Sequence, residues 1–408
     1  DLLRKQDIEL PQWISFAKVR ASIAQVGNDL EPYQLYSTYK IEKDPNGGTM
    51  ANVDNTLYSD KVRSELIKSR EVGLELRLFD NRLGFDLAWY RSNATNQLIR
   101  LPMDPASGYE AKIINAGDIQ NEGFELMITA DILRSEAFKW NAQLNLSHNE
   151  NRIIKLYQGN GQDSPVTEYD LGTYDNLQIL AREGGKYGEI WGTTFKRVED
   201  PSSPLYGKIL TDADGLPIAG EKKKLGDQQP DLLAGLTNTF SFAGFDLSFL
   251  IDARIGGKMF SGTNHALQAN GSSANTAVNG RKKFVVDGAV EKNVGGKKVY
   301  EKNTTEVTPQ DYWGAISGRS GNLGINEANV FDATNVRLRN IALSYTLPQS
   351  LLRKTPITRA KLGFSCNNVW MIKSYMNGVD PESVFATGSN ATGYEFASSP
   401  TTRSFLFN

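Results

Sequence analysis

The sequence predicts an all-β protein, a transmembrane antiparallel β-barrel with short turns at one end of its strands and long loops at the other. Apolar and polar residues alternate with a period of two in segment after segment. Tight turns join neighbouring segments, and long polar stretches separate the resulting pairs. A soluble β-sandwich has turns every 8–12 residues or so throughout, so the unequal connections favour the barrel.

Segment 138–149 shows the alternation most clearly. Its even positions are apolar or aromatic from Phe138 to Leu146. Its odd positions carry the polar side chains of Lys139, Asn141, Gln143 and Asn145. Successive side chains of a strand point to opposite faces, so this segment has one apolar face and one wet face. We expect the wet face to line water, whereas the apolar face needs lipid or a core to cover it.

The connections between such segments differ in length. The same alternation recurs at 17–23, 71–78, 85–90, 124–132 and 245–252. Tight turns are expected at 80–83, 133–137 and 241–244. Long polar loops are expected at about 28–70, 96–118, 199–230, 256–334 and 373–400. Short turns on the periplasmic side and long loops on the extracellular side are typical of outer-membrane barrels.

Eleven strands can be placed directly from the pattern. They are 13–25, 71–80, 83–93, 121–132, 138–149, 187–197, 231–241, 244–254, 335–347, 360–372 and 402–408. Strands 138–149 and 187–197 would then run outward in succession, which an antiparallel wall forbids. We therefore expect a weak strand at about 167–182 that ends in a tight turn at 183–186, which gives about twelve strands. A single helical turn is expected at 350–354.

Composition excludes several classes of function. The 408 residues are 39% hydrophobic, and no run approaches the length of a membrane helix. The net charge of −2 gives no basic footprint for nucleic acid. The single cysteine, Cys366, excludes an intrachain disulfide, and the two distant histidines argue against a histidine metal site. We expect no cofactor.

No catalytic constellation is present in the sequence, so we expect the protein not to be an enzyme. Asp246 and Asp252 share one face of a strand, which a polar barrel lumen explains better than a glycosidase pair. Segment 211–215 has an Asp-Gly turn, although its first residues also resemble the start of a calcium loop. The sequence leaves a calcium site in loop 199–230 open.

Aromatic residues in the expected outer loops are candidates for ligand contact, because rings stack on sugar faces and clamp peptides. The candidate substrate-binding residues are Tyr206, Tyr312, Trp313, Arg319, Tyr375, Phe385 and Tyr394. The basic run 281–283 is expected to be a solvated surface or a contact for lipopolysaccharide or an anionic ligand. Aromatic residues within strands are instead expected at the membrane interface: Trp89, Trp140 and Tyr345.

Several stretches resemble the carboxy-terminal region of SusC/RagA-type TonB-dependent outer-membrane transporters of Bacteroidota. The resemblance lies, in the family's order, in 13–29, 115–126, 230–249, 336–348, 378–382 and 400–405. Each motif is weak alone, but six in sequence are specific. The family's barrel has 22 strands, so residues 1–408 are expected to be the carboxy-terminal part of a barrel. Its plug domain and TonB box are absent from this chain.

The resemblance implies a function and partners. A SusC-like barrel would actively import a nutrient across the outer membrane, oligosaccharide before peptide, with a SusD-like surface lipoprotein as its lid. TonB would act through the missing plug, and outer-membrane lipid and lipopolysaccharide would surround the barrel. The alternative class is a soluble all-β glycan-binding module, which would require a packed inner face. The wet odd face of 138–149 argues against that alternative.

Overall fold

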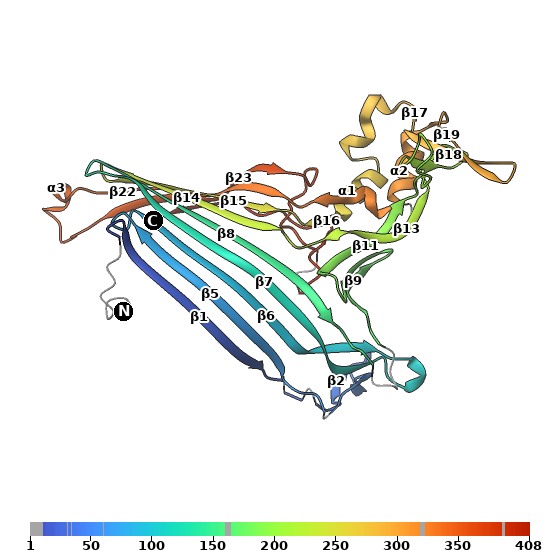
Figure 1. Cartoon of the computed structure of the whole chain (residues 1–408), viewed down its shortest axis with the longest axis horizontal. Coiled ribbons are helices and arrows are strands. Elements are labelled where there is room, and N and C mark those ends of the chain that lie inside the picture. The colour runs from blue at the N-terminus through green and yellow to red at the C-terminus, as the bar shows by residue number, and fades with distance from the viewer. Residues whose placement is uncertain are drawn as a thin grey trace. The chain divides into compact units, whose positions relative to one another are not determined.

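The computed structural model describes residues 11–30, 32–33, 35–59, 61–159, 165–318, 323–385 and 388–408. One sheet dominates it (Figure 1), and ten of its eleven strands follow one another in a single order, while the short β4 (Thr56–Leu57) pairs with β7 off this path. In sheet order, these wall strands are β1 (Ile14–Asn28), β5 (Glu65–Leu78), β6 (Leu83–Pro102), β7 (Ala111–Arg134), β8 (Phe138–Lys155), β14 (Leu232–Phe242), β15 (Phe245–Ile255), β22 (Asn335–Thr346), β23 (Lys361–Ser374) and β25 (Ser404–Phe407).

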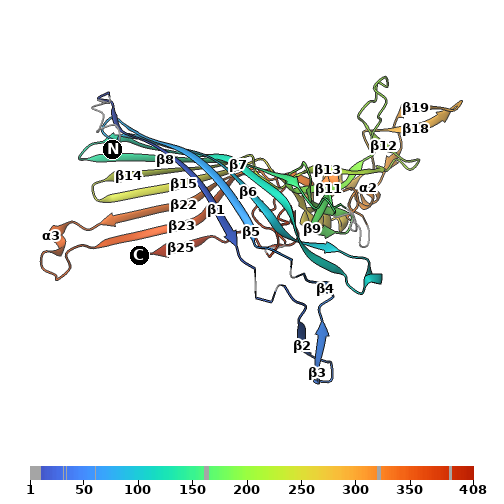
Figure 2. The same cartoon turned by 60° about the horizontal axis from the view of Figure 1, so that its bottom comes forward.

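The chain divides into two compact units. The first comprises residues 1–126, 149–169 and 182–186 and contains β1, β5 and β6. The second comprises residues 127–148, 170–181 and 187–408. Within the second unit β14, β15, β22, β23 and β25 lie side by side in that order (Figure 2).

The strand register places apolar side chains on one face of the sheet. In the second unit, Leu236 of β14 lies between Leu144 of β8 and Ile251 of β15. Residues directly opposite each other in an antiparallel pair share a face, so these three form an apolar row. On the other face, Thr239 lies between Asn141 and Ser248, which forms a polar row. The alternation read from 138–149 is thus confirmed as two chemically different faces.

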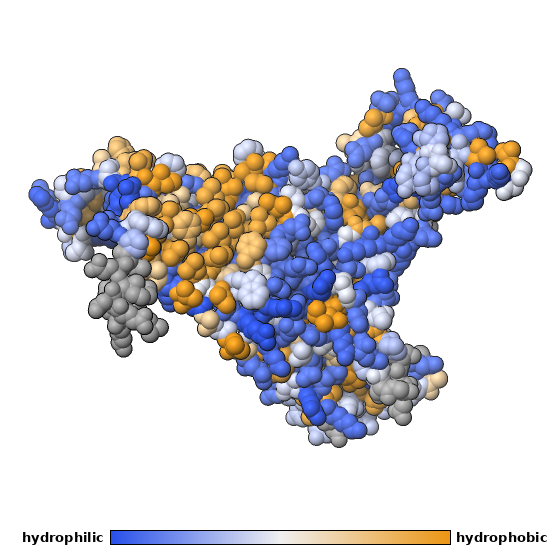
Figure 3. Space-filling model, in the orientation of Figure 1, coloured by the Kyte–Doolittle hydropathy of each residue, from blue (hydrophilic) through white to orange (hydrophobic). Residues whose placement is uncertain are grey.

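The apolar face is exposed to an unusual degree. Val19 is 74% exposed, Ile23 85% and Phe407 80%, although all three lie in regular strands. Soluble proteins rarely leave such large contiguous apolar surfaces uncovered. Figure 3 shows a broad area of apolar side chains over the wall strands and mainly hydrophilic side chains beyond their loop ends. Lipid contact is the physical explanation for this surface.

Two of the expected wall strands are not part of the wall. Strand β8 pairs directly with β14, so the chain between them leaves the sheet and returns. The expected strands 167–182 and 187–197 instead belong to a separate four-stranded sheet. The predicted count of about twelve wall strands was therefore wrong, and the remaining ten are confirmed. A period of two identifies a strand but does not say which sheet the strand joins. Without 187–197 in the wall, strand 138–149 runs outward and strand 231–241 runs inward, so the antiparallel order needs no extra strand.

The expected tight turn at 183–186 exists, but it lies at the loop end of the wall. The Gly184 N–H donates to the Ile153 carbonyl of β8 over 2.8 Å, and the Ile153 N–H donates to the Gly185 carbonyl over 2.9 Å. These bonds satisfy the backbone at the far end of a wall strand. The turn thus supports the excursion and does not close a wall hairpin.

The tight turns of the wall hairpins were correctly predicted. Strands β14 and β15 are joined by Ala243 and Gly244, whose φ angles are 48° and 87°. Positive φ at both central positions defines the type I′ turn that suits the twist of a two-residue hairpin. The turn between β5 and β6 has positive φ at Phe79, Asp80 and Asn81. The predicted helical turn at 350–354 is confirmed as α3 (Gln349–Leu352).

The loop ends of the strands carry small sheets and helices of their own. A four-stranded sheet contains β9 (Glu168–Tyr174), β10 (Leu177–Arg182), β11 (Tyr187–Phe195) and β13 (Ala219–Asp227). One three-stranded sheet contains β12 (Ile209–Thr211), β18 (Gly288–Val294) and β19 (Lys297–Lys302), and another contains β16 (Lys258–Ser261), β21 (Val330–Asp332) and β24 (Tyr394–Glu395). Two further pairs are β17 (Phe284–Val285) with β20 (Glu306–Val307) and β2 (Tyr39–Lys43) with β3 (Thr49–Val53). The helices are α1 (Gly262–Ala269) and α2 (Pro309–Ser317), with 3₁₀ turns η2 (Pro105–Ser107), η3 (Ala274–Arg281) and η4 (Asn326–Asn329). Among the described residues, no helix is long and apolar enough to cross a membrane.

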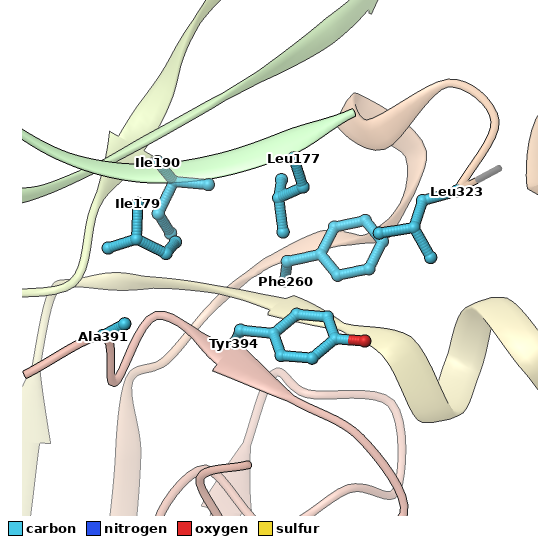
Figure 4. Close-up of a cluster of buried hydrophobic side chains, with 7 residues drawn as sticks. All are labelled: Leu177, Ile179, Ile190, Phe260, Leu323, Ala391 and Tyr394. Atoms are coloured by element: carbon cyan, nitrogen blue, oxygen red, sulfur yellow. The ribbon is translucent and has the colours of Figure 1, made fainter. Parts of the chain in front are cut away.

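The largest buried apolar cluster of the described residues lies in these loop-end elements of the second unit. Figure 4 shows its members: Leu177, Ile179, Ile190, Phe260, Leu323, Ala391 and Tyr394. They come from β10, β11, β16, β24 and the loops beside them, which are far apart in the sequence. The excursion and the last two long loops therefore fold together around one core, which gives the loop end a fixed shape.

Candidate ligand-binding site

A cleft of about 630 Å³ lies among the loop-end helices of the second unit. Trp313 of α2 lines it, together with the end of α1 and parts of η3. The lining residues are Gln268, Ala269, Asn270, Gly271, Thr276, Arg281, Thr308, Pro309, Gln310 and Trp313. A volume of this size suits a small ligand or a few residues of an oligomer.

Local sequence chemistry places Trp313 on the cleft. Thr308 caps α2, because its hydroxyl accepts from the Asp311 N–H over 3.1 Å and donates to the Asp311 carboxylate over 2.6 Å. Pro309 occupies the first helical position, where a missing N–H costs nothing. On the other side, the Tyr312 ring meets Phe284 edge-on with centroids 5.1 Å apart. This anchor and the cap together fix the rotation of α2.

Gln268 holds the elements around the cleft together. Its side-chain oxygen accepts from the Ser317 hydroxyl and from the Asn329 amide, each over 3.0 Å. These partners lie on α2 and η4, while Gln268 lies on α1. All three side chains are buried, and the two hydrogen bonds to Gln268 join α1, α2 and η4, while the Asn329 Oδ1 atom is buried without a partner among the described residues. The cleft is therefore preorganised by the protein itself.

Arg281 supplies the charge of the cleft. Its guanidinium donates to the Gly271 carbonyl over 2.8 Å. The backbone reaches this position through left-handed residues, with φ of 53° at Asn279, 65° at Gly280 and 59° at Arg281. Among the lining residues it is the one charged side chain, so the cleft favours neutral or anionic ligands. The predicted basic run 281–283 therefore begins at the rim of a cleft.

The cleft combines an indole ring, amide side chains, hydroxyls and a guanidinium. A ring next to donors and acceptors suits hydroxyl-rich ligands, because the apolar face of a sugar stacks while its hydroxyls form hydrogen bonds. A peptide carboxylate would also suit Arg281. No catalytic group accompanies these residues in the lining. The arrangement therefore supports binding.

The structure separates the other predicted contact residues. Tyr206 is 61% exposed and borders a second hollow of about 650 Å³ beside β11 and β13. Tyr375 is half exposed, with the Lys373 ammonium 4.9 Å from its ring centre. The Tyr312 ring contacts the Trp313 ring edge-on at 5.2 Å and anchors α2 against Phe284. Arg319 lies outside the described residues.

Phe385 and Tyr394 do come together, but Tyr394 is a core residue. Its ring stacks on Tyr174 at 4.0 Å and meets Phe385 edge-on at 5.4 Å. Burial, helped by the nearby Glu395 carboxylate, raises the pKa of Tyr394 to about 12. With 6% of its surface exposed, Tyr394 organises the loop and presents little ring surface to a ligand. Half-exposed Phe385 is the accessible member of the pair.

The predicted interface aromatics lie in wall strands. Trp89 of β6 is 40% exposed on the apolar face, opposite Val72. Trp140 stacks on Phe240 at 5.5 Å, and its indole N–H donates to Asn238 over 3.0 Å. The Tyr345 ring lies 4.4 Å from Phe245. Their place at the membrane interface stays a prediction.

Segment 211–215, which resembles the start of a calcium loop, forms an Asp-Gly turn. The Asp212 carboxylate accepts from the Asp214 and Leu216 N–H groups over 3.0 and 2.9 Å. Gly215 has a φ of 81°, as an Asp-Gly turn requires. Within the described residues, no group of three or more His, Cys, Asp or Glu side chains is arranged to hold a metal.

Sequence reasoning missed an ion network at the loop ends of β15 and β22. Arg337 and Asp380 form a buried pair with side chains 5% and 8% exposed. Neighbouring Arg339 bridges Asp252 over 2.8 Å and also contacts Glu382. The pairs join the polar face of the wall to the last long loop. Two arginines on the polar face and the carboxylates of 378–382 were the signal for it.

The Asp380 carboxylate is strongly held in its ionised form. Burial opposes ionisation, but the Arg337 guanidinium and the N–H groups of Glu382 and Thr401 donate to the carboxylate, and the pKa of Asp380 lies well below its usual range. The Thr401 hydroxyl adds a further hydrogen bond of 2.7 Å. The last long loop is thus tied to the wall at both ends, near 380 and 401.

Comparisons with known proteins agree with this architecture. A family model described as "TonB dependent receptor-like, beta-barrel" matches residues 10–195. TonB-dependent receptor P3 of Formosa agariphila is 26% identical over 95% of this chain and 38% of its own length. TonB-dependent receptor SusC of Bacteroides thetaiotaomicron is 22% identical over 56% of this chain and 22% of its own length.

Solved structures share the fold. The RagAB peptide transporter superposes with a TM-score of 0.70 at 18% identity, over 99% of this chain and 42% of that chain. The RagAB peptide importer in its closed-closed state gives 0.69 at 18% identity, over 99% and 42%. This chain spans about two fifths of the length of the first of these relatives.

The chain is similar to the TonB-dependent receptors, and its wall is a β-barrel wall of the outer membrane. The similarity to SusC and the fold shared with the RagAB structures agree with the SusC/RagA-type motifs of the sequence. The all-β barrel class and the outer-membrane location are thereby confirmed.

Proposed function

We propose that the full-length protein actively imports a nutrient across the outer membrane, and that residues 1–408 form the carboxy-terminal part of its barrel. The observation that carries this proposal is the wall, which exposes large apolar side chains on one face and polar side chains on the other. The first face suits lipid and the second lets hydrated solute pass. A plug outside this chain would couple transport to TonB, and a SusD-like lipoprotein would cover the outer side.

Oligosaccharide is the first proposed substrate class and peptide the second. The Trp313 cleft favours the sugar, because it joins an aromatic face to amides and hydroxyls. The peptide alternative draws on the RagAB peptide transporter, which has the same fold. The soluble glycan-binding alternative is disfavoured by the exposed apolar face of β1.

We also propose that the chain has no catalytic role. The two carboxylates considered as a glycosidase pair, Asp246 and Asp252, already have hydrogen-bond or ion-pair partners. Asp246 accepts from Ser241 over 2.7 Å and pairs with Lys361 over 2.9 Å. Asp252 pairs with Arg339 over 2.8 Å. Neither is placed as a free acid or base.

Uptake by cells that produce the full-length protein tests the proposal. We expect fluorescent oligosaccharides to accumulate, and a protonophore to abolish the accumulation. Labelled peptides form the second arm. Absence of accumulation in both arms, in cells that display the folded protein, would overturn the import function.

Trp313→Ala tests the cleft. Loss of the stacking ring should weaken oligosaccharide binding about tenfold, whereas Trp313→Phe should retain most of it. Tyr206→Ala is the matched control, because it removes an exposed ring from the other hollow. Weakening by Tyr206→Ala alone, measured by isothermal titration on purified protein, would move the site away from Trp313.

A further inference from the structure

The register of the first unit shows where its apolar face ends. Leu74 of β5 lies between Val19 and Leu87, and the next outward row contains Val72 and Trp89. Successive rows on one face are about 6.7 Å apart along a strand. The apolar surface thus continues to Trp89, a residue type that favours the boundary between lipid tails and headgroups.

The two rows beyond Trp89 on the same face are basic. The first contains Ile23, Arg70 and Arg91, and the second contains Gln25, Lys68 and Asn93. Both rows lie toward the long-loop ends of β5 and β6, which is the extracellular side of an outer-membrane barrel. Lys68, Arg70 and Arg91 are exposed. These cations therefore lie at the level of the outer-leaflet headgroups.

Arg70 and Arg91 are direct cross-strand partners. Like charges in this position destabilise a sheet unless a counter-charge lies between them. Arg91 donates to Gln120 over 3.1 Å, and its Nε lies 3.6 Å from Glu122. Within the described part of the chain, Arg70 and Lys68 make no ion pair. The outward rows thus carry cations that the protein does not neutralise.

The opposite face of the same strands behaves differently. There, Arg20 of β1 lies 2.7 Å from Asp86 and 3.3 Å from Glu71, so two carboxylates neutralise one cation. The protein thus pairs its arginine on the water-lining face, but leaves Arg70 and Lys68 unpaired on the lipid-facing side. A counter-charge from the membrane would complete the outward rows.

We propose that Lys68, Arg70 and Arg91 bind the phosphate groups of lipopolysaccharide in the outer leaflet. Two guanidinium groups side by side offer paired N–H donors that match phosphate oxygens, and Lys68 adds a point charge one row further out. Lipid tails would lie along Leu74, Val72 and Trp89 below. The site fixes the depth of this part of the wall in the membrane.

Native mass spectrometry of the full-length protein in detergent, titrated with diphosphoryl lipid A, tests the site. The triple variant Lys68→Gln, Arg70→Gln, Arg91→Gln should bind at least about tenfold more weakly. The matched control changes the same charge in the β18–β19 hairpin, with Lys297→Gln, Lys298→Gln and Lys302→Gln, and should bind as the parent does. Heat-modifiable migration on gels checks that both variants fold.

Two further arms identify the source of the phosphate. Dephosphorylated lipid A should bind to the parent protein and to the triple variant with equal affinity. Inorganic phosphate at millimolar concentration should not displace diphosphoryl lipid A. Equal binding of parent and triple variant, or displacement by inorganic phosphate alone, would overturn the proposal. Neither result depends on whether the protein imports oligosaccharide.

Discussion

Single side chains distinguish the two faces of the wall. Leu144 and Gln143 are neighbours in β8, yet Leu144 lies opposite Leu236 in the apolar row, and Gln143 lies opposite Thr237 on the polar face. A shift of one residue along the strand therefore moves a side chain from the lipid-facing side to the water-facing side. The same substitution at the two positions should have very different costs.

Leu144→Arg should destabilise the folded barrel by about 2–4 kcal/mol if the residue lies near the middle of the bilayer, because a cation is placed in lipid. Gln143→Arg is the control and should be tolerated on the polar face. Refolding into lipid vesicles across a urea series measures both. Equal tolerance of the two substitutions would contradict the assignment of faces.

A second prediction at this scale concerns Asp380. Its pKa is lowered in the folded protein, so its contribution to stability is present above the usual aspartate pKa and is lost as the pH falls toward the folded value. Asp380→Asn should weaken the last loop's attachment by about 1.5–3 kcal/mol at pH 7, because Arg337 loses its nearer counter-charge and keeps only Glu382, 3.5 Å away.

Hydrogen–deuterium exchange of residues 375–385 measures this effect, after correction for intrinsic rates. The difference between parent and Asp380→Asn should stay constant from about pH 5 to 8 and shrink below about pH 4. Thr401→Ser keeps the hydroxyl that donates to Asp380 and should behave as the parent. A difference that grows with acid would show that the ion pair does not hold the loop.

At the scale of elements, hairpin turns follow closely from the sequence. The turn of β14 and β15 needs left-handed backbone at two successive positions, and the chain has Ala243 followed by Gly244. A Cβ on Gly244 would lie 3.1 Å from the Thr346 carbonyl oxygen and 3.2 Å from the Tyr345 ring. Glycine is required at Gly244, whereas Ala243 bears strain that glycine would relieve.

Ala243→Gly should therefore stabilise the hairpin by about 1 kcal/mol, since a left-handed alanine costs about that much. Gly244→Ala should destabilise it by a similar or larger amount. Urea unfolding in detergent, followed by tryptophan fluorescence, measures both changes. Loss of stability in Ala243→Gly would contradict the I′ assignment.

Sequence patterns located wall strands well for a physical reason. Leu74, Leu236 and their neighbours face lipid while adjacent residues face water, and this contrast imposes a period of two on the chain. The pattern failed for 187–197 because β11 has its own buried side, with Ile190 fully buried in the loop-end core. Alternation indicates that one face of a strand is shielded from water. It does not tell whether lipid or a folded loop shields that face.

The candidate site was only partly predictable. Trp313 was identifiable as an exposed-loop aromatic, but its cleft depends on Gln268 and Arg281, which lie more than thirty residues earlier on α1 and η3. Tyr394 had the same local signal as Trp313, yet tertiary contacts with Tyr174 and Phe260 bury it. Long-range packing decides which loop aromatics remain open.

At the scale of the molecule, we expect the wall to fold without the loop-end core. The wall continues from β8 to β14 without the intervening residues, so removal of 168–227 should leave the wall folded. The same deletion removes Leu177, Ile179 and Ile190 from the core and should expose Phe260 and Tyr394.

A deletion variant that joins 167 to 228 through a short glycine–serine linker tests this separation. We expect heat-modifiable migration typical of a folded barrel, together with rapid tryptic cleavage within 256–334. The variant should also lose oligosaccharide binding, because α1 and α2 no longer rest on an intact core. Loss of the folded wall would show that the excursion is part of the barrel's stability.

The direct pairing of β8 with β14 also has an evolutionary consequence. An insertion between two strands that are already partners in the sheet can lengthen, shorten or be exchanged by recombination without a change in strand number. Selection on the proposed ligand would then act on 156–231 almost independently of selection on membrane insertion. Among relatives of this chain, we expect that interval to diverge in length and sequence faster than the strands on either side of it.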